Sequence, residues 1–320
     1  MRLTHGLPAS GGRQRAAKRD ATPTVLTIGN FDGVHLGHQA LLGQLVAHAR
    51  RLAMPATVLT FEPQPREYFA ALRHQDPPRR VSSLREKIAL LSDAGVDAVH
   101  VCRFNQALAQ MPAEEFIQRL LVGGMGMRHL VIGDDFRFGA GRAGDFNLLG
   151  EMGEKLGYGI TAMPTLLSDA QRVSSSAVRD ALAKADLGLA EQLLGRPYAL
   201  CGRVVQGRKL GRELGFPTAN IQLRRNTLPL TGIFAVTVTG AGLQDYPGAA
   251  SLGVRPTLGH GLAPCCEVHL PDYSGNLYGQ HLTLTFRHKL RDEAKYDSFE
   301  DLKQAIALDV ARTKELLSHG

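Results

Sequence analysis

The sequence of 320 residues lacks any apolar run that approaches the roughly 18 residues of a membrane-spanning helix, so we expect no such helix. The first twenty residues are rich in Gly, Arg and Lys and have no apolar core of the kind that a secretory signal carries. Cysteine is scarce, and Cys102, Cys201, Cys265 and Cys266 include no CxxC pair. These absences favour a reduced, cytoplasmic protein.

Positive charge is concentrated at the start of the chain. The formal net charge is +7, and +4 of it comes from the first twenty residues. The remaining chain carries no strong excess of cations, so we expect no basic face for nucleic acid. A mild excess fits a protein that handles phosphorylated small molecules, and it fits a solvated surface with a basic tail equally well.

Two kinds of pattern divide the chain, and its length fits two domains. Residues 1–22 form a basic, partly flexible segment that includes a short candidate strand over residues 2–6. Apolar runs then alternate with amphipathic helices through residues 23–186, which predicts an α/β domain with a parallel sheet and ligands at the carboxyl ends of its strands. We expect strands over 25–28, 57–61, 98–101, 129–132 and 159–163, and helices over 39–52, 84–94, 113–121 and 148–156.

Residues 187–320 follow a different pattern. Alternating β-rich runs separated by Gly and Pro predict a small antiparallel β-barrel. A final helix should pack on the barrel, because apolar residues recur on one of its faces. The expected strands cover 198–205, 233–239, 249–254, 266–270 and 281–286, and the face of the helix consists of Phe299, Leu302, Ile306, Val310 and Leu317.

The stretch from Gly29 to His38 joins an expected strand to an expected helix. Its glycines permit a tight turn, and His35 and His38 lie three residues apart at the helix start, where both rings can face one side. Backbone N–H groups and two imidazoles at such a place suit an anion, and we interpret the stretch as a triphosphate site. A zinc pair and a purely structural role are the alternatives, although no third zinc ligand of suitable spacing is evident.

Two further stretches carry chemistry. Ser174, Ser175 and Ser176 precede a helical pattern, and capping that helix explains only one of these serines. Arg179 gains nothing from the dipole at a helix start, so its position is easier to understand if it reaches a phosphate.

The second stretch is a glycine-rich lead into Pro-Thr-Ala-Asn. On its own that tetrapeptide is read equally well as a turn, but its hydroxyl and amide oxygens are also ligands that Mg²⁺ accepts. The residues of this stretch are Gly202, Gly207, Lys209, Gly211, Arg212, Thr218 and Asn220.

These stretches resemble motifs of the bacterial bifunctional riboflavin kinase/FAD synthetase family. Residues 29–38 resemble GxFDGxHxGH, and residues 173–179 resemble ISSTxIR, with Val173 and Ser176 in place of Ile and Thr. Residues 61–66 resemble FxPHPR, with Gln64 where His is frequent, and residues 132–139 resemble the loop G-x-D/N-F-x-F-G. Residues 202–220 are similar to the riboflavin kinase loop and its PTAN motif. The resemblance extends from about residue 26 to the C-terminus.

The resemblance implies an FMN adenylyltransferase domain over residues 23–186 and a riboflavin kinase domain over residues 187–320. Glu267 would be the catalytic base of the kinase, and Arg291 would contribute to its flavin pocket. The substrates would be riboflavin, FMN and ATP, the products FMN and FAD, and the metal Mg²⁺ held by Thr218 and Asn220. In the adenylyltransferase, catalysis would use His35, His38 and Arg179. Its phosphates would be bound by Gly29, Asn30, Phe31, Asp32, Gly33 and the three serines, and its flavin or nucleotide by Asp134, Asp135, Phe136 and Phe138.

Other functions would explain fewer of the motifs in the sequence. A different HxGH nucleotidyltransferase, acting on a pyridine nucleotide or a pantetheine phosphate, explains the first domain but leaves the PTAN loop unused. A flavin-binding regulatory protein with an inactive kinase module is a second alternative, and the presence of Glu267 argues against it. The sequence does not predict an oligomeric state.

Overall fold

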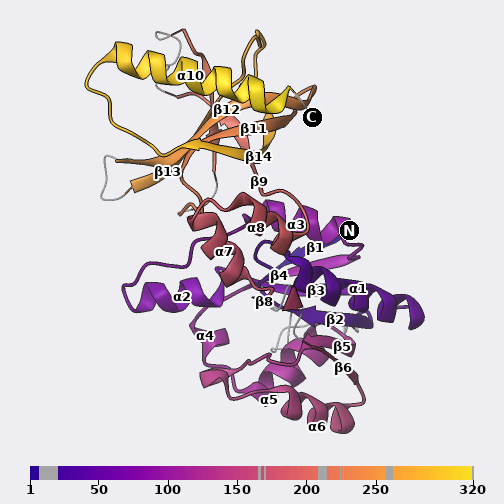
Figure 1. Ribbon diagram of the computed structural model, residues 1–320. Coiled ribbons are helices and arrows are strands. Elements are labelled where there is room, and N and C mark those ends of the chain that lie inside the picture. Colours follow the sequence, from indigo (N-terminus) through magenta and orange to yellow (C-terminus); the bar gives the residue numbers. More distant parts are fainter. Residues whose placement is uncertain are drawn as a thin grey trace. The chain divides into compact units, whose positions relative to one another are not determined.

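The computed structural model describes residues 1–6, 21–164, 167–168, 171–207, 215–223, 225, 227–256 and 262–318. The chain divides into two compact units, unit 1 with Met1–Pro78 and Lys87–Val173 and unit 2 with Arg79–Glu86 and Ser174–Gly320 (Figure 1). Within the described ranges, no helix is both long and apolar enough to cross a membrane.

Unit 1 is built on six strands that pair in parallel in the order β1-β4-β3-β2-β5-β6. The residues of β2 (Thr24–Ile28) are all buried, as expected for a strand covered on both faces. The sheet confirms the predicted parallel architecture, including a first strand near residues 2–6. The other strands are β1 (Arg2–His5), β3 (Ala56–Glu62), β4 (Ala98–Arg103), β5 (Met127–Gly133) and β6 (Gly159–Met163).

The longest helix of unit 1, α1 (Leu36–Arg51), buries Leu42, Leu45 and Ala49 and contacts β2, β3 and β5. It begins three residues earlier than predicted because the side chain of His35 caps it. The helix expected over 113–121 is α5 (Ala113–Glu115) continued by a π-helix, η1 (Phe116–Gly124). Remaining elements are α2 (Pro65–Leu72), α3 (Leu84–Asp93), α4 (Gln106–Ala109), η2 (Ala140–Arg142), α6 (Phe146–Leu156), β7 (Leu167–Ser168) and β8 (Gln171–Arg172).

The strand order places a switch point in the middle of this sheet. From β2 the chain proceeds outward through β3 and β4, and it then returns to the other side of β2 to form β5. The loops that leave the carboxyl ends of β2 and β5 therefore lead away in opposite directions. Ligands of open α/β sheets bind at such a point.

Unit 2 contains a closed barrel in the order β10-β13-β12-β11-β14-β9, with antiparallel pairing throughout its described strands. The predicted antiparallel barrel is thus confirmed. Its inward side chains, among them Phe234, Val268 and Phe286, are buried. The strands are β9 (Ala199–Val205), β10 (Thr218–Gln222), β11 (Gly232–Gly240), β12 (Leu243–Pro256), β13 (Leu262–His269) and β14 (His281–Arg291).

The C-terminal helix α10 (Phe299–Leu317) packs along β11, β12 and β14, as Figure 1 shows. The predicted packing is confirmed, but Phe299 is 70% exposed and does not belong to the packed face. Asp309 and Thr313 are instead buried on that face. Polar residues are possible there because each finds a partner: Asp309 accepts from Arg291, and Thr313 Oγ1 donates to the Asp309 carbonyl at 2.8 Å.

Among the elements that were not expected from the sequence are α2, α8 (Leu187–Leu194) and β10, and unit 2 also contains α7 (Ser175–Ala183). For α2 the signal was present, because Pro65 occupies the first turn and Glu67 accepts from the Gln64 N–H at 2.9 Å. The division between units falls at Val173, so α7 and α8 belong with the barrel, whereas the expected domain boundary at residues 186/187 stays a prediction.

Candidate active sites

The first candidate site is the loop between β2 and α1. Phe31 and Val34 adopt positive φ angles of 48° and 42°, which non-glycine residues rarely do. The Phe31 side chain is fully buried, and a Cβ at Gly29 would lie only 3.1 Å from its ring. Glycine at position 29 thus lets the loop fold over its own phenylalanine. Strain of this kind persists where the surroundings fix the backbone, typically at functional sites.

The two histidines of this loop form a stacked pair. His35 is the N-cap of α1, and its Nδ1 accepts from the His38 backbone N–H at 3.3 Å. The rings stack with centroids 3.7 Å apart, and the His38 ring lies 5.0 Å from that of Phe31. A Cβ at Gly37 would approach the His35 ring to 3.3 Å, which explains the glycine between them. The predicted arrangement, with both imidazoles at one helix start, is therefore present.

The pKa of His38 lies well below the usual value of 6.5 because its ring is removed from water, and because His35 and the buried Lys87 place further positive charge nearby. His38 is accordingly neutral at pH 7. Its Nδ1 atom is enclosed and has no hydrogen-bond partner among the described residues. A neutral imidazole offers one donor and one acceptor, so it can bind a phosphate oxygen through a hydrogen bond without carrying a charge.

This pKa makes stability depend on pH. In the unfolded chain His38 titrates near 6.5, whereas the folded protein resists the proton, so its contribution is complete above pH 6.5 and is lost as the pH falls below it. Unfolding in denaturant between pH 5 and 8 should show a free energy that falls by up to about 1.4 kcal/mol per pH unit from this group. The variant His38→Gln should have a flatter profile. Equal slopes for both proteins would contradict the assignment.

A second loop leaves the neighbouring strand β5. Phe138 is buried, and its ring lies 5.5 Å from that of Phe136 and 5.6 Å from that of Phe116. Phe138 therefore anchors the loop in the core. Asp134 and Asp135 are exposed, and Asp135 pairs with Arg172. The loop follows β5, which pairs with β2, the strand before the histidine loop. A site shared by the two loops stays a prediction.

An aromatic cluster at the carboxyl ends of β3 and β4 was not predicted. The ring of Phe104 lies 5.8 Å from that of Phe61, 5.3 Å from that of Tyr68 and 5.9 Å from that of Phe69. Phe69, on α2, is 39% exposed. The FxPxPR stretch marked this region, but the cluster depends on α2, which brings two of the four rings. Such rings can stack on a planar ligand.

The serine motif lies at the start of α7. Ser174 is the N-cap and accepts from the Ala177 N–H at 3.2 Å, which confirms that capping accounts for one serine of the three. Ser175 is half-buried, Ser176 is exposed, and Arg179 donates to Ser176 Oγ at 3.1 Å. These residues belong to unit 2 and the histidines to unit 1, so their convergence stays a prediction.

The second candidate site lies on β10 and β13. Asn220 pairs in register with Glu267, and Glu267 pairs with Ser251 on its other side. Paired residues project to the same face, and Thr218, two positions from Asn220, shares it. A Cβ at Gly207 would collide with the Asn220 side chain, so this glycine of the lead lies directly against Asn220. The amide, the hydroxyl and the carboxylate are thus gathered from strands far apart in sequence.

His269 contacts the residues next to this site, and the sequence pattern did not predict its role. Its Nδ1 lies 2.9 Å from the Pro217 carbonyl, and its ring makes an edge contact with Phe216 at 5.4 Å. It therefore fixes the residues immediately before Thr218. The only sequence signal was its spacing two residues after Glu267, which places both on one face of the strand.

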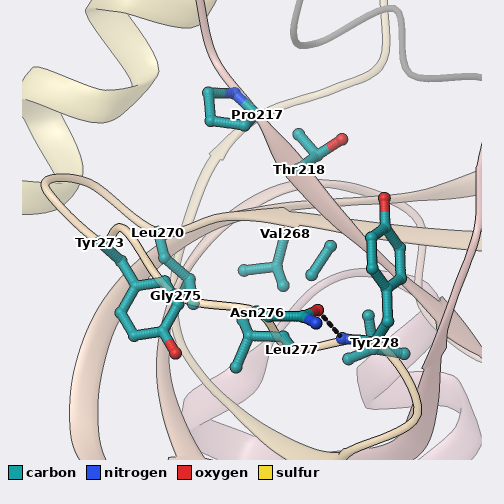
Figure 2. Close-up of a pocket in the computed structure, with 11 residues that line it drawn as sticks. Pro217, Thr218, Val268, Leu270, Tyr273, Gly275, Asn276, Leu277 and Tyr278 are labelled. Atoms are coloured by element: carbon teal, nitrogen blue, oxygen red, sulfur yellow. Dashed lines mark hydrogen bonds between the residues drawn. The ribbon is translucent and has the colours of Figure 1, made fainter.

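A pocket of about 400 Å³ opens beside Thr218 (Figure 2). Its walls combine aliphatic side chains with two tyrosines and the carboxamide of Asn276, whose Oδ1 accepts from the Tyr278 N–H at 3.1 Å. An apolar pocket with a few polar groups is the usual form of a small-molecule site. The lining residues are Val204, Pro217, Thr218, Ala219, Val268, Leu270, Tyr273, Gly275, Asn276, Leu277 and Tyr278.

The remaining residues predicted for the kinase site have other surroundings or fall outside the described ranges. Arg291 donates from Nε and Nη2 to the Asp309 carboxylate, with distances of 2.7 to 3.2 Å, and lies 5.7 Å from the Tyr296 ring centroid. Its visible role is to attach α10 to the end of β14, and its flavin contact stays a prediction. Gly202 lies in β9 against β10. Lys209, Gly211 and Arg212 fall outside the described residues.

Comparisons with known proteins match both halves. The family model of FAD synthetase matches residues 17–177, and that of riboflavin kinase matches residues 194–317. The chain is 49% identical to the bifunctional riboflavin kinase/FMN adenylyltransferase of Pseudomonas fluorescens, over 91% of this chain and 92% of the relative. It is 48% identical to the protein of that description from Escherichia coli K12 over the same shares, and 47% identical to that of Haemophilus influenzae over 93% and 96%. A Streptococcus pneumoniae structure described as a macrolide-efflux protein superposes with a TM-score of 0.77 at 26% identity, covering 97% of this chain and 98% of that one.

Proposed function

Because the chain belongs to the bacterial bifunctional riboflavin kinase/FMN adenylyltransferase family, we propose that it makes FMN and then FAD. In the first reaction the 5′-hydroxyl of riboflavin attacks the γ-phosphorus of ATP, and ADP leaves. In the second, the phosphate of FMN attacks the α-phosphorus of another ATP, and pyrophosphate leaves. Both are direct displacements, so the chain must chiefly position its substrates and neutralise charge.

The observation that carries this proposal is that separate family models, of FAD synthetase and of riboflavin kinase, match the two parts of one chain. An adenylyltransferase for a pyridine nucleotide or a pantetheine phosphate would leave the pairing of Asn220 with Glu267 without a use.

In the kinase site, Glu267 is the residue we assign as general base. On β13 it is paired with Asn220 of β10 on one side and with Ser251 of β12 on the other, where it can accept the proton of the attacking hydroxyl. Thr218 and Asn220 offer neutral oxygen ligands on the same face, which is the donor chemistry that suits Mg²⁺ with phosphate oxygens. The ion would supply charge neutralisation at the phosphates.

The pocket beside Thr218 fits the nucleotide of the kinase reaction. Its apolar walls and tyrosines suit a planar base, and Asn276 adds hydrogen-bonding groups. A base held there leaves the triphosphate to extend past Thr218 toward Gly207 and Asn220, which lie in contact with each other. Close backbone approach at a glycine is what phosphate binding requires.

In the adenylyltransferase site, His35 and His38 are assigned to the phosphates of ATP, together with the loop from Gly29 and with Ser174–Arg179. A neutral His38 can donate a hydrogen bond to an oxygen on which charge develops. The exposed carboxylates of Asp134 and Asp135 are assigned to the polar groups of the substrates.

The aromatic cluster is assigned to the flavin ring of FMN. Removing the exposed ring by Phe69→Ala should raise the KM for FMN in FAD formation about 2- to 10-fold, the range expected for losing one aromatic stacking contact. FMN formation from riboflavin should not change. Leu72→Ala, on the same helix and 61% exposed, is the matched control and should leave both reactions unchanged. An unchanged KM for FMN in Phe69→Ala would remove the cluster from the site.

We place both reactions in the cytoplasm. The support is that Cys102, Cys201, Cys265 and Cys266 are all thiols that form no disulfide, which suits a reducing compartment. Recovery of both activities in the soluble cytoplasmic fraction of cells that express the chain tests this placement, and their recovery outside it would contradict it.

Incubation of the purified protein with riboflavin and MgATP, followed by chromatographic separation of the flavins, tests the proposed function. FMN should appear first and FAD after it. A well-folded protein that yields neither flavin would exclude the proposal.

A further inference from the structure

A segment from the first half of the chain, Arg79–Glu86, belongs to the same compact unit as the barrel. Its last residue, Glu86, lies in the first turn of α3, and the side chain is largely buried, with 11% exposed. Glu86 Oε2 accepts from the Ser83 N–H at 2.6 Å, as in a capping box. The same carboxylate also contacts the barrel, so it does more than cap a helix.

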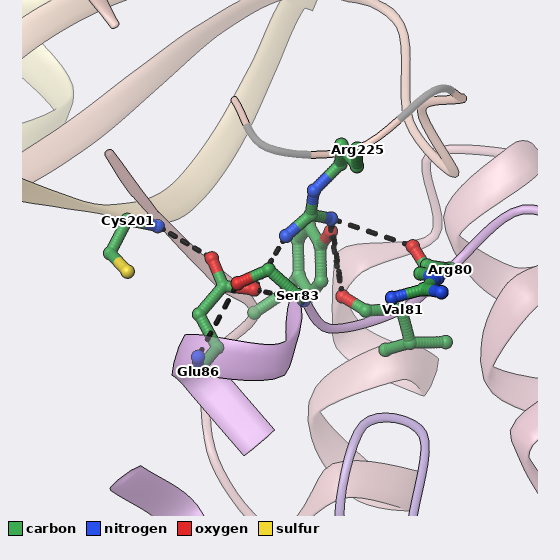
Figure 3. A network of polar contacts seen from close by, with 7 residues as sticks. Arg80, Val81, Ser83, Glu86, Cys201 and Arg225 are labelled. Atoms are coloured by element: carbon green, nitrogen blue, oxygen red, sulfur yellow. Dashed lines mark hydrogen bonds and ion pairs between the residues drawn. The ribbon is translucent and has the colours of Figure 1, made fainter. Parts of the chain in front are cut away.

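Glu86 makes two bonds to the barrel (Figure 3). Its Oε1 accepts from the backbone N–H of Cys201 on β9 at 2.7 Å, and its Oε2 pairs with the guanidinium of Arg225. The Arg225 side chain is only 1% exposed. Hydrogen bonds between ionised groups in a buried setting are strong, and removing one partner leaves a buried charge uncompensated.

Arg225 completes the connection from the other side. Its Nη1 donates to the carbonyls of Arg80 and Val81 at 3.4 Å and to the Tyr198 hydroxyl at 3.3 Å. That hydroxyl in turn donates to the Val81 carbonyl at 3.2 Å. Residues 80, 81 and 86 of the segment are therefore bound to Arg225, Tyr198 and Cys201 through backbone as well as side-chain groups. We refer to Glu86, Arg225, Tyr198 and the Cys201 N–H as the Glu86–Arg225 lock.

The Glu86–Arg225 lock joins β9 to the residues that follow β10, and β10 is one of the two strands that carry the proposed kinase site. Cys201 lies in the middle of β9, and Arg225 follows the end of β10 by three residues. These strands pair with each other through Asn220 and Val205, and a Cβ at Gly202 would collide with β10. Asn220 in turn faces Glu267 on β13. A change in the spacing of β9 and β10 would therefore move Asn220 relative to Glu267.

We propose that Glu86 and Arg225 are positioning residues of the kinase site, supplied jointly by the two halves of the chain. They keep β9 and β10 at the spacing that sets Thr218 and Asn220 opposite Glu267. The inference rests on the proposed kinase function. It also makes the kinase module discontinuous in sequence, because residues 79–86 act with residues 174–320.

The test uses the full-length chain with Arg225→Met. We expect kcat/KM for FMN formation to fall at least about tenfold, with a higher KM for MgATP, because small displacements of positioning groups cost large factors in rate. FAD formation from supplied FMN should stay within about twofold. A merely structural loss would lower kcat through the fraction of folded protein and leave the KM for MgATP unchanged.

Two further variants sharpen the test. In Glu86→Gln/Arg225→Met no buried carboxylate is left unpaired, and the amide oxygen can still accept from Cys201, but the guanidinium that binds Arg80 and Val81 is still missing, so FMN formation should stay about as low as in Arg225→Met. Arg312→Met is the matched control, since it removes an ion pair of the same unit whose side chains are 55% and 63% exposed, and it should change nothing. If Arg225→Met does not fold, Arg225→Lys replaces it: the lysine keeps a charge for Glu86 but loses the bonds to Arg80 and Val81, and a selective loss of about threefold is expected.

The outcomes separate the inference from the function on which it rests. A parent protein that forms no FMN would overturn both. An active parent together with a folded Arg225→Met that keeps its FMN formation, or that loses both activities equally, would overturn the positioning role alone. A selective loss of FMN formation that persists in the double variant would support it, whereas recovery in the double variant would attribute the loss to the unpaired Glu86 charge and overturn the positioning role.

Discussion

Glu267→Gln should reduce FMN formation about 10²- to 10⁴-fold, the usual contribution of a positioned general base. Glutamine has nearly the same shape and preserves the packing beside Asn220 and Ser251, but it cannot take a proton from the riboflavin hydroxyl. The measurement is the initial rate of FMN formation from riboflavin and MgATP. FAD formation from supplied FMN should continue at the parent rate, because the histidine loop lies in the other compact unit.

The matched control for this variant is Glu300→Gln, an exposed carboxylate on α10 of the same unit, which should leave both reactions unchanged. Two results would contradict the assignment. One is a folded Glu267→Gln protein that still forms FMN at the parent rate. The other is a folded variant that loses FAD formation as well, since independent sites would then be the wrong description.

The double variant His35→Ala/His38→Ala should do the reverse and reduce FAD formation about 10²- to 10³-fold, the range seen when donors to a developing oxyanion are removed. FMN formation from riboflavin should persist. His35 is also the N-cap of α1, so alanine at this position costs about 1 kcal/mol of stability in addition. The effect on rate must therefore be separated from the effect on the helix.

A cap-preserving variant makes that separation. Asparagine is a good N-cap, so His35→Asn/His38→Gln keeps an acceptor for the His38 backbone N–H while it removes both imidazoles. Its unfolding free energy should exceed that of the double alanine variant, yet its FAD formation should be equally low. Parent-level FAD formation in the cap-preserving variant would show that the rings serve only to cap and pack.

The parts of the fold that depend on local pattern were predictable. Alternating strands and helices gave the parallel sheet, and the HxGH stretch placed two imidazoles at the start of α1, because the spacing of residues along a helix sets their relative direction. The position of this stretch at a switch point follows from strand order, which the sequence pattern leaves open. Motif resemblance, rather than periodicity, made Glu267 a candidate.

What the pattern could not reveal are contacts between distant residues. Glu86 and Arg225 are 139 positions apart, and nothing local marks either as a partner of the other. The motif predicts that Phe138 contacts a ligand, but its ring packs against Phe116 and belongs to the core. For Arg291 the motif predicts a role in the flavin pocket, and the structure adds a contact with Asp309 that the sequence did not indicate. In each case long-range packing decides what the side chain touches.

The most direct test of the central claim follows the phosphates of ATP into the flavins. Riboflavin is incubated with the protein and ATP labelled at either the γ- or the α-phosphorus, and the flavins are separated. Label from the γ-position should appear in both FMN and FAD, because the transferred phosphate is kept when FMN is adenylylated, and label from the α-position should appear in FAD alone. A well-folded protein that places neither label in a flavin, or α-label in FMN, would contradict two consecutive reactions on one chain.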